Sequence, residues 1–355
     1  MELAISSKHT YRHAVIIGTL FVLLLLLFLF SLSIGAVPIS VNEIIRIFLS
    51  RIGIGGINES GIQSLVLLNI RLPRLLFTTL IGAALGISGA SMQGLFRNPL
   101  VEPGIVGVSS GAALGAISVI LGLGSLSSSV IMGIGQWLLP AFAFVGGLMA
   151  TAVTLRLGSH EGKTQTTILI LAGVAISSLA GAAIGLAIFY ADEHQLRTFT
   201  FWTLGDLSVA TWQKVFMLAP FSLIAIAGLS FLGKPLNALA LGEAEAFHSG
   251  VHVERLKIII VLLCSLAVST SVAFAGIIGF VGLVVPHIIR ISFSPDHQLL
   301  LPASAIGGAV LLMLSDMLGR TVVVPAELPI GIITAAIGTP FFLYLLITTK
   351  RKRML

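Results

Sequence analysis

Charged residues are scarce in this sequence: Asp, Glu, Lys and Arg make up 10% of its 355 residues. Soluble globular domains carry about 25%, so the composition excludes a soluble domain. The short alternating segments of about 10 residues that build membrane β-barrels are also absent. What is present is 56% hydrophobic side chains and a mean hydropathy of +1.08. Apolar runs of about 20 residues therefore predict an all-α, polytopic membrane protein.

Cysteine is nearly absent too, and the single Cys264 lies inside an apolar run. It can form no internal disulfide and no cysteine metal cluster. The apolar runs contain no H-E-x-x-H motif and no paired aspartates, so intramembrane proteolysis has no visible chemistry. We therefore predict no catalytic residues, no metal site and no bound cofactor for this chain.

No hydrophilic stretch is long enough for a soluble domain that binds and hydrolyses ATP. Two sequences resemble a nucleotide-binding loop but do not match it. Residues 228–235, GLSFLGKP, have the right spacing but carry proline where Ser or Thr would ligate magnesium. Residues 158–164, GSHEGKT, are one residue short. Any ATP and magnesium must therefore bind to another subunit, and the chain itself is not expected to be an enzyme.

The apolar runs predict one transmembrane domain over 1–355 with about ten spans. The first run is too long for a signal-peptide core. The expected spans are 14–34, 73–95, 104–122, 138–157, 166–190, 211–232, 255–275, 277–293, 299–318 and 330–349.

Basic residues predict the topology of these spans. A cytoplasmic N-terminus places thirteen of the 20 Lys and Arg residues on the cytoplasmic side, as the positive-inside rule requires. The even number of spans also puts the C-terminal KRKR inside. Topology thus explains the net charge of +6, and no nucleic-acid partner is needed.

Small residues and one pair of opposite charges predict how the helices pack inside the membrane. Glycines recur at four-residue spacing, which lets helices approach closely and indicates a dense bundle; they are Gly82, Gly86, Gly107, Gly111, Gly115, Gly181 and Gly185. Asp316 lies within a span with Arg320 four residues later, a spacing that favours a local ion pair over a proton site. The scarcity of mid-membrane carboxylates argues against an ion-coupled secondary transporter.

Two features predict contacts outside the bilayer. The cytoplasmic loop 235–254 contains good helix formers, so we expect one short helix over 237–248 that stops at Gly250. That helix either lies on the membrane surface or docks into a partner's groove. On the outer side, Arg71, Arg74 and Arg320 either contact phospholipid headgroups or pair with acidic side chains of an external partner.

The motifs together resemble one family, the permease subunits of binding-protein-dependent ABC importers for iron-siderophores, heme and cobalamin. The resemblance covers nearly the whole chain in order. The matching segments are RLPR at 71–74, GAALGISGASMQGLFRNPLVEPGIVGVSSGAALG at 82–115, LNALALGEAEAFHSGV at 236–251, GIIGFVGLVVPHIIR at 276–290 and PAELPIGIITAAIGTPFFLYLL at 325–346.

The resemblance implies a cobalamin-permease-like fold in the bacterial inner membrane, with both termini cytoplasmic. It implies a homodimer with two cytoplasmic ATPase subunits below and a periplasmic binding protein above. Three residue sets follow from it: binding-protein docking by Arg71, Arg74 and Arg320; ATPase coupling by Leu241, Gly242, Glu243 and Gly250; and a pathway with a gate along span 166–190 at Thr166, Thr167, Gly173 and Gly181.

The cargo is less sharply marked than the transport class. LFRNPLVEPGIVGVSSGAALGA and RTVVVPAELPIG look most like heme permeases, so we expect heme, with ferric siderophore and cobalamin as alternatives of the same family. Seven of the eight histidines fall on or near the cytoplasmic side, and none is apparent as an axial ligand along the path. An ion-coupled transporter and a non-transport membrane scaffold remain the competing classes.

Overall fold

The computed structural model describes residues 2–35, 37–51, 61–122, 128–323 and 325–353. These residues are mainly helical, and the predicted all-α membrane fold is confirmed. The only strands among them, β1 (Ser159–His160) and β2 (Lys163–Thr164), form one antiparallel hairpin. The α-helices are α1 Glu2–Ser33, α2 Val41–Arg51, α3 Ile62–Val66, α4 Leu72–Phe96, α5 Val108–Gly122, α6 Ser128–Gly158, α7 Thr166–Tyr190, α8 Glu193–Thr203, α9 Trp212–Ser230, α10 Gly233–Leu241, α11 Glu243–His248, α12 Val253–Ala275, α13 Val281–Ser292, α14 His297–Thr321 and α15 Ile330–Arg353.

Within the described ranges, seven helices are long and apolar enough to cross a membrane. Three shorter apolar helices, Val108–Gly122, Val281–Ser292 and Ile330–Tyr344, accompany them. Together they overlap the ten predicted spans in chain order. Two of the short helices start later than predicted for a visible reason. Gly107 adopts φ 84 just before α5, and residues 276–280 are not helical ahead of α13.

The start of the second predicted span differs from expectation. Instead of a loop before residue 73, the chain is helical from Ile62 onward and passes through a π turn, Leu67–Arg71, into α4. Pro73 has no N–H to donate to the carbonyl of Asn69, and a wider turn relieves the crowding that its ring would cause. The arginines of RLPR therefore lie on a continuous helix.

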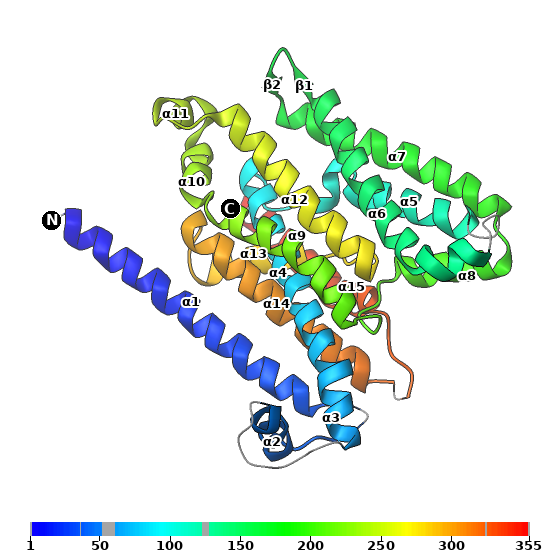
Figure 1. The fold of residues 1–355 in the computed structure, drawn as a ribbon. Coiled ribbons are helices and arrows are strands. Elements are labelled where there is room, and N and C mark those ends of the chain that lie inside the picture. The colour runs from blue at the N-terminus through cyan, green and yellow to red at the C-terminus, as the bar shows by residue number, and fades with distance from the viewer. Residues whose placement is uncertain (1, 36, 52–60, 123–127, 324, 354–355) are drawn as a thin grey trace.

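The helices form two packed groups around α4 and α12 (Figure 1). The helices α1, α4, α13 and α14 make one group and α5, α6, α7 and α8 the other, with α12 packed against both α4 and α6. Glycine permits the closest crossings. A Cβ on Gly86 would lie 2.1 Å from the carbonyl oxygen of Ser304 on α14, and one on Gly115 would lie 2.1 Å from that of Phe142 on α6.

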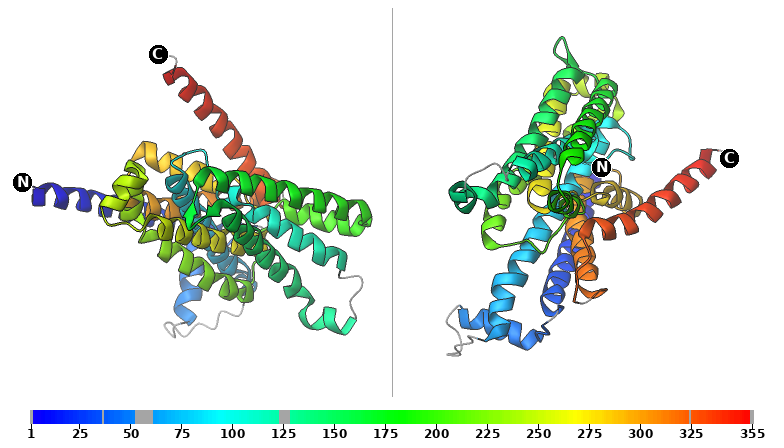
Figure 2. Two further views of the ribbon diagram at one scale, coloured as in Figure 1. Left: turned by 90° about the horizontal axis from the view of Figure 1, so that it is seen from above. Right: turned by 90° about the vertical axis from the view of Figure 1, so that its right-hand side faces the viewer.

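Two glycines of the predicted packing set behave differently. A Cβ on Gly181 or Gly185 would meet nothing within 4 Å in this chain. Close backbone packing within this chain is therefore absent at these two described positions, because the face of α7 that carries them points away from the rest of the chain. Figure 2 shows α7 along one side of the molecule and α15 projecting from the body.

The predicted single helix over 237–248 is also wrong. The chain forms two helices, α10 and α11, that are broken at Gly242, whose φ of 140 and ψ of 155 no helix accommodates. The predicted stop at Gly250 is confirmed by its φ of 85 and by its N–H, which donates to the carbonyl of Phe247. The break turns α11 relative to α10 and sets up the site below.

Candidate functional sites at the two ends of the bundle

Charged side chains gather at two opposite ends of the bundle. We call the end that carries α10, α11 and the β1–β2 hairpin the hairpin end, and the end that carries Arg71, Arg74 and Arg320 the arginine end (Figure 1). The helix α4 joins them, since Arg74 lies in its first turn and Arg97 caps its other terminus.

A single ammonium organises the hairpin end. Lys257, on the first turns of α12, is 2% exposed. Its Nζ donates to Glu243 Oε2 and to the Thr164 carbonyl, both at 2.8 Å, and to Glu254 Oε1 at 3.0 Å. An ammonium has three donors, so all of them are used. We call Lys257, Glu243, Glu254 and Thr164 the lysine cluster.

The lysine cluster holds the hairpin by its backbone. The Thr164 N–H donates to Glu254 Oε2 at 2.6 Å, so both polar backbone groups of this residue are tied to α12. The hairpin turns at Glu161 and Gly162, both with positive φ, as a two-residue hairpin loop of type I′ requires. Gln165 follows as the N-cap of α7.

Two of the four residues predicted to couple to an ATPase, Glu243 and Gly250, line a groove at the hairpin end. Leu241 and Phe247 are exposed large side chains, at 79% and 70%. A groove of about 990 Å³ runs along α11 and the start of α12 and includes Glu243, Phe247 and Gly250 among its lining residues. Exposed apolar side chains beside a concave surface suit docking to another protein.

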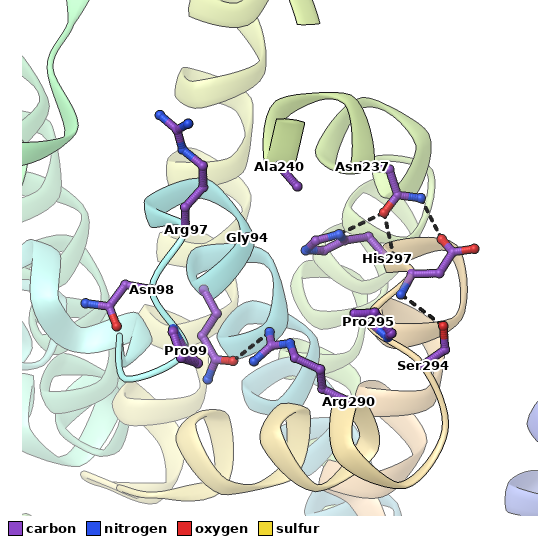
Figure 3. Close-up of a pocket in the computed structure, with 12 residues that line it drawn as sticks. Gly94, Arg97, Asn98, Pro99, Asn237, Ala240, Arg290, Ser294, Pro295 and His297 are labelled. Carbon is purple, nitrogen blue, oxygen red and sulfur yellow. Dashed lines mark hydrogen bonds between the residues drawn. The ribbon is translucent and has the colours of Figure 1, made fainter. Parts of the chain in front are cut away.

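A socket on the same end anchors α10 (Figure 3). The Asn237 side chain donates to Asp296 Oδ1 at 2.6 Å and accepts the His297 N–H at 2.8 Å. Across a cavity of about 530 Å³, Arg290 donates to Gln93 Oε1 at 3.1 Å. The bonds of Asn237 and the packing of α10 on α14 fix α10 to the bundle. The helix α11 follows after the break at Gly242.

At the arginine end, the central buried charge is a carboxylate, and its partners are guanidinium groups. Asp316 is 2% exposed and its Oδ1 accepts from Arg74 Nε at 2.9 Å, while its other oxygen lies 3.1 Å from Arg320 Nε. The predicted local pair between Asp316 and Arg320 is thus confirmed. Arg74 also pairs through two bonds, at 3.0 and 2.7 Å, with the exposed Glu327. We call these four residues the arginine cluster.

The other arginine of RLPR ties down the end of α1. Arg71 is 4% exposed and donates to the carbonyls of Leu32 and Val37. Arg320 donates to the carbonyl of Ile34 at 3.2 Å. Guanidinium groups that satisfy the last carbonyls of a helix stabilise its terminus. The structure therefore brings the three predicted docking arginines together but engages each of them internally, and Arg71 is the least accessible.

The predicted pathway residues share one helix but not one environment. Thr166 is half-buried and Thr167 is exposed at the start of α7. Gly173 is buried against the carbonyl of Ile105, which a Cβ would approach to 2.0 Å, whereas Gly181 is exposed with an open surrounding. The pathway and docking roles stay predictions.

Comparison with known proteins identifies the chain. The FecCD transport family matches residues 23–348, which is most of the sequence. The chain belongs to the FecCD transport family. It is therefore an ABC importer permease, a multi-pass membrane protein, as the motifs predicted.

Individual relatives of this FecCD permease carry different cargo in their names. The hemin transport permease HmuU of Yersinia pestis is 38% identical over 338 residues, covering 95% of this chain and 96% of that protein. The cobalamin import permease BtuC of Halobacterium salinarum is 42% identical over 277 residues, covering 78% and 72%. A solved structure described as an inward-facing metal-chelate type ABC transporter has a TM-score of 0.81 and 32% identity, covering 94% and 99%.

The sequence did not single out several residues that the structure brings to these sites. Lys257, Glu254 and Thr164 were not marked, because nothing local distinguishes a lysine in the first turns of a span. Glu327 is the second partner of Arg74, 253 residues away. His194, on α8, is the histidine that does not fall on or near the predicted cytoplasmic side.

Proposed function

We propose that this FecCD permease imports heme iron as a homodimer, powered by two cytoplasmic ATPase subunits and loaded by a periplasmic binding protein. The observation that carries the heme assignment is the match to HmuU, which spans both proteins almost end to end. The match to the cobalamin permease has higher identity but leaves more than a quarter of that relative uncovered.

One face of α8 has chemistry that suits heme. His194, Arg197 and Phe201 are exposed and lie at spacings of three and four residues, which places them on one helix face. The Arg197 guanidinium lies 5.7 Å from the centre of the Phe201 ring. An imidazole can ligate iron axially, a guanidinium can pair with a propionate, and an aromatic ring can stack on a porphyrin.

The placement of α8 supports a role at the entrance. The helix α7 starts beside the hairpin and its 25 residues carry the chain to the opposite end, where α8 follows (Figure 1). Phe199 packs into the core and the Asp192–Gln195 capping box fixes the start of α8. The exposed face is thus rigidly held at the end where a binding protein would release its cargo.

The two charged clusters suit two different partners. In the proposed orientation the arginine end faces the binding protein and Arg74 contacts one of its carboxylates. The hairpin end faces the ATPase. A groove on the surface of the ATPase receives α11 and its flanking residues, among them Leu241, Gly242, Glu243 and Gly250. ATP binding there would move α11, and alternating access would follow, because cargo alone can shift the equilibrium only by its differential affinity for the two states.

A second copy of the chain would cover the open face of α7. Only 22% of the most apolar part of α7 is buried within this chain, and Gly181 and Gly185 lie on it with no neighbour. Small residues on an apolar helix favour close helix pairing in lipid. These observations support our proposal that the homodimer interface and the pathway with Thr166, Thr167, Gly173 and Gly181 run along α7.

Uptake by proteoliposomes tests the cargo directly. The permease is reconstituted with its ATPase and binding protein, and the uptake of heme, a ferric siderophore and cobalamin is compared with ATP inside. We expect ATP-dependent uptake of heme alone. Uptake of cobalamin or of the siderophore instead would reject heme and leave the transporter class intact.

The α8 face gives a residue-level test of the same proposal. His194→Ala should lower heme uptake and remove any Soret shift that the detergent-solubilised permease produces on titration with heme. His160→Ala, an exposed histidine at the hairpin end, serves as the matched control and should change neither readout. An unaltered Soret shift in His194→Ala would remove this histidine from the heme path.

A further inference from the structure

We infer that Lys257 is a positioning residue that transmits the movement of α11 to the start of α7 through the hairpin. The inference rests on the proposed function, since it needs an ATPase that moves α11 and a pathway along α7. It names a physical connection that the order of the chain does not provide. Helices α11 and α7 are separated in sequence by α8, α9 and α10.

The contacts of Lys257 link the two helices directly. Glu243 is the first residue of α11, and its carboxylate lies 2.8 Å from the ammonium. The carbonyl of Thr164 lies 2.8 Å from the same nitrogen. Thr164 precedes α7 by a single residue, Gln165. One atom therefore touches both the beginning of α11 and the segment that leads into α7.

Burial makes this link stiff. The Lys257 side chain is 3% exposed, and a buried ammonium that loses a partner faces a large desolvation penalty. Its three donors point to three fixed acceptors, so moving Glu243 away would leave one donor unpaired. Displacing α11 as a unit with α12 and the hairpin preserves all three bonds. The cluster therefore favours joint movement over separation.

The surroundings restrict movement to this link. Gly242 breaks the chain between α10 and α11, and α10 is held by Asn237 to Asp296. Within α11 only Ala246 is buried. Thus α11 buries little of its own surface, and both its break from α10 at Gly242 and its bond to Lys257 lie at its first turn. A push on its exposed face would reach the hairpin and α7 through the contact between Glu243 and Lys257.

Coupling efficiency is the measurement that a purely structural role would not move. The reconstituted complex of permease, ATPase and binding protein is assayed for cargo taken up per ATP hydrolysed. In Lys257→Met we expect this ratio to fall about tenfold with ATP hydrolysis retained. Glu243→Gln, which alters only a half-exposed carboxylate, should lower the ratio in the same direction. Lys234→Met, an exposed lysine on α10, is the control and should keep the wild-type ratio.

A distance measurement separates transmission from simple loss of folding. Spin labels replace Glu245 on α11 and Thr167 on α7 in a Cys264→Ala background, because Cys264 is the one native cysteine. With Lys257 present, the distance distribution should stay narrow in nucleotide-free and ATP-trapped states. With Lys257→Met it should broaden or shift between the states.

The outcomes decide the inference independently of the cargo. An assembled Lys257→Met complex with an unchanged uptake-to-ATP ratio, or with an unchanged distance distribution, would overturn it. If Lys257→Met fails to assemble, Glu243→Gln supplies both readouts, and a wild-type ratio there overturns the inference as well. If the wild-type complex carries a siderophore or cobalamin instead of heme, the ratio is measured with that cargo, so failure of the heme proposal is distinguishable.

Discussion

The lysine cluster and the arginine cluster are built on opposite signs. At the hairpin end a buried ammonium, Lys257, is surrounded by two carboxylates. At the arginine end a buried carboxylate, Asp316, is surrounded by two guanidinium groups, and one of these binds a further carboxylate, Glu327. Both central residues are 2% exposed, so each buried charge depends on partners of the opposite sign.

The clusters differ in what they join. Arg74 and Asp316 link α4 to α14, two helices that glycines already hold in contact along their length. Lys257 links α12 to the hairpin and to α11, which buries only Ala246. The same kind of bonding therefore joins two tightly packed helices at the arginine end and a weakly packed helix, a hairpin and α12 at the hairpin end.

Removing the buried carboxylate should disrupt the arginine cluster most severely. Asp316→Ala leaves Arg74 and Arg320 without their shared partner, and breaking a buried ion pair costs about 3–5 kcal/mol. We expect a large drop in the thermal unfolding midpoint of the detergent-solubilised permease. His160→Ala, at the exposed tip of the hairpin, is the control. A midpoint for Asp316→Ala equal to that of wild type would show that the arginine cluster does not hold α4 to α14.

Arg74 and Glu327 test whether the arginine cluster presents charge to a partner. Arg74→Glu should weaken capture of the binding protein by about 2–5 kcal/mol if the partner offers a carboxylate. Glu327→Gln releases the guanidinium from its internal partner and should strengthen capture, by a smaller factor. Surface plasmon resonance with immobilised permease measures both. Equal affinity in all three proteins would remove Arg74 from docking.

The close approach of α4 and α14 predicts a smaller effect. Gly86→Ala places a methyl group 2.1 Å from the carbonyl oxygen of Ser304, and overpacking of this kind costs about 1–3 kcal/mol. The unfolding midpoint should fall. Gly18→Ala on α1, where a Cβ meets nothing within 4 Å, should leave the midpoint at or above that of wild type. A larger loss in Gly18→Ala than in Gly86→Ala would contradict the packing described here.

The smallest expected effect is that of a substitution at the exposed tip of the hairpin. His160 and Glu161 lie 3.8 Å apart with side chains 80% and 86% exposed, and exposed pairs contribute little. We expect His160→Ala to leave both the midpoint and the uptake-to-ATP ratio unchanged. A clear loss of uptake would show that the tip, and not only the base at Thr164, contacts a partner.

Local sequence patterns predicted a large part of this molecule. Apolar runs marked where the helices lie, because a bilayer imposes a length and a polarity on whatever crosses it. The pair of Asp316 and Arg320 was predictable because residues four apart share a helix face. Gly250 was predictable as a stop because a residue with positive φ commonly ends a helix.

Other features could not be predicted because their partners are distant in sequence. Pattern alone continued the helix through Gly242 and treated Gly181 and Gly185 as packed, although whether a glycine breaks a helix or contacts a neighbour depends on what surrounds it. The sequence predicted Arg71 as an outer surface residue, whereas in the structure it is buried against the end of α1.

The sequence by itself determined the class of this protein, the chain order of its apolar helices and its family, since these follow from composition and from motifs read along the chain. Only the tertiary structure decided which charges are buried and what they join. Lys257 meets Thr164 across 93 residues, and Arg74 meets Asp316 across 242. The physical reason is that the desolvation of a charge and its pairing depend on neighbours in space, and folding alone brings those neighbours together.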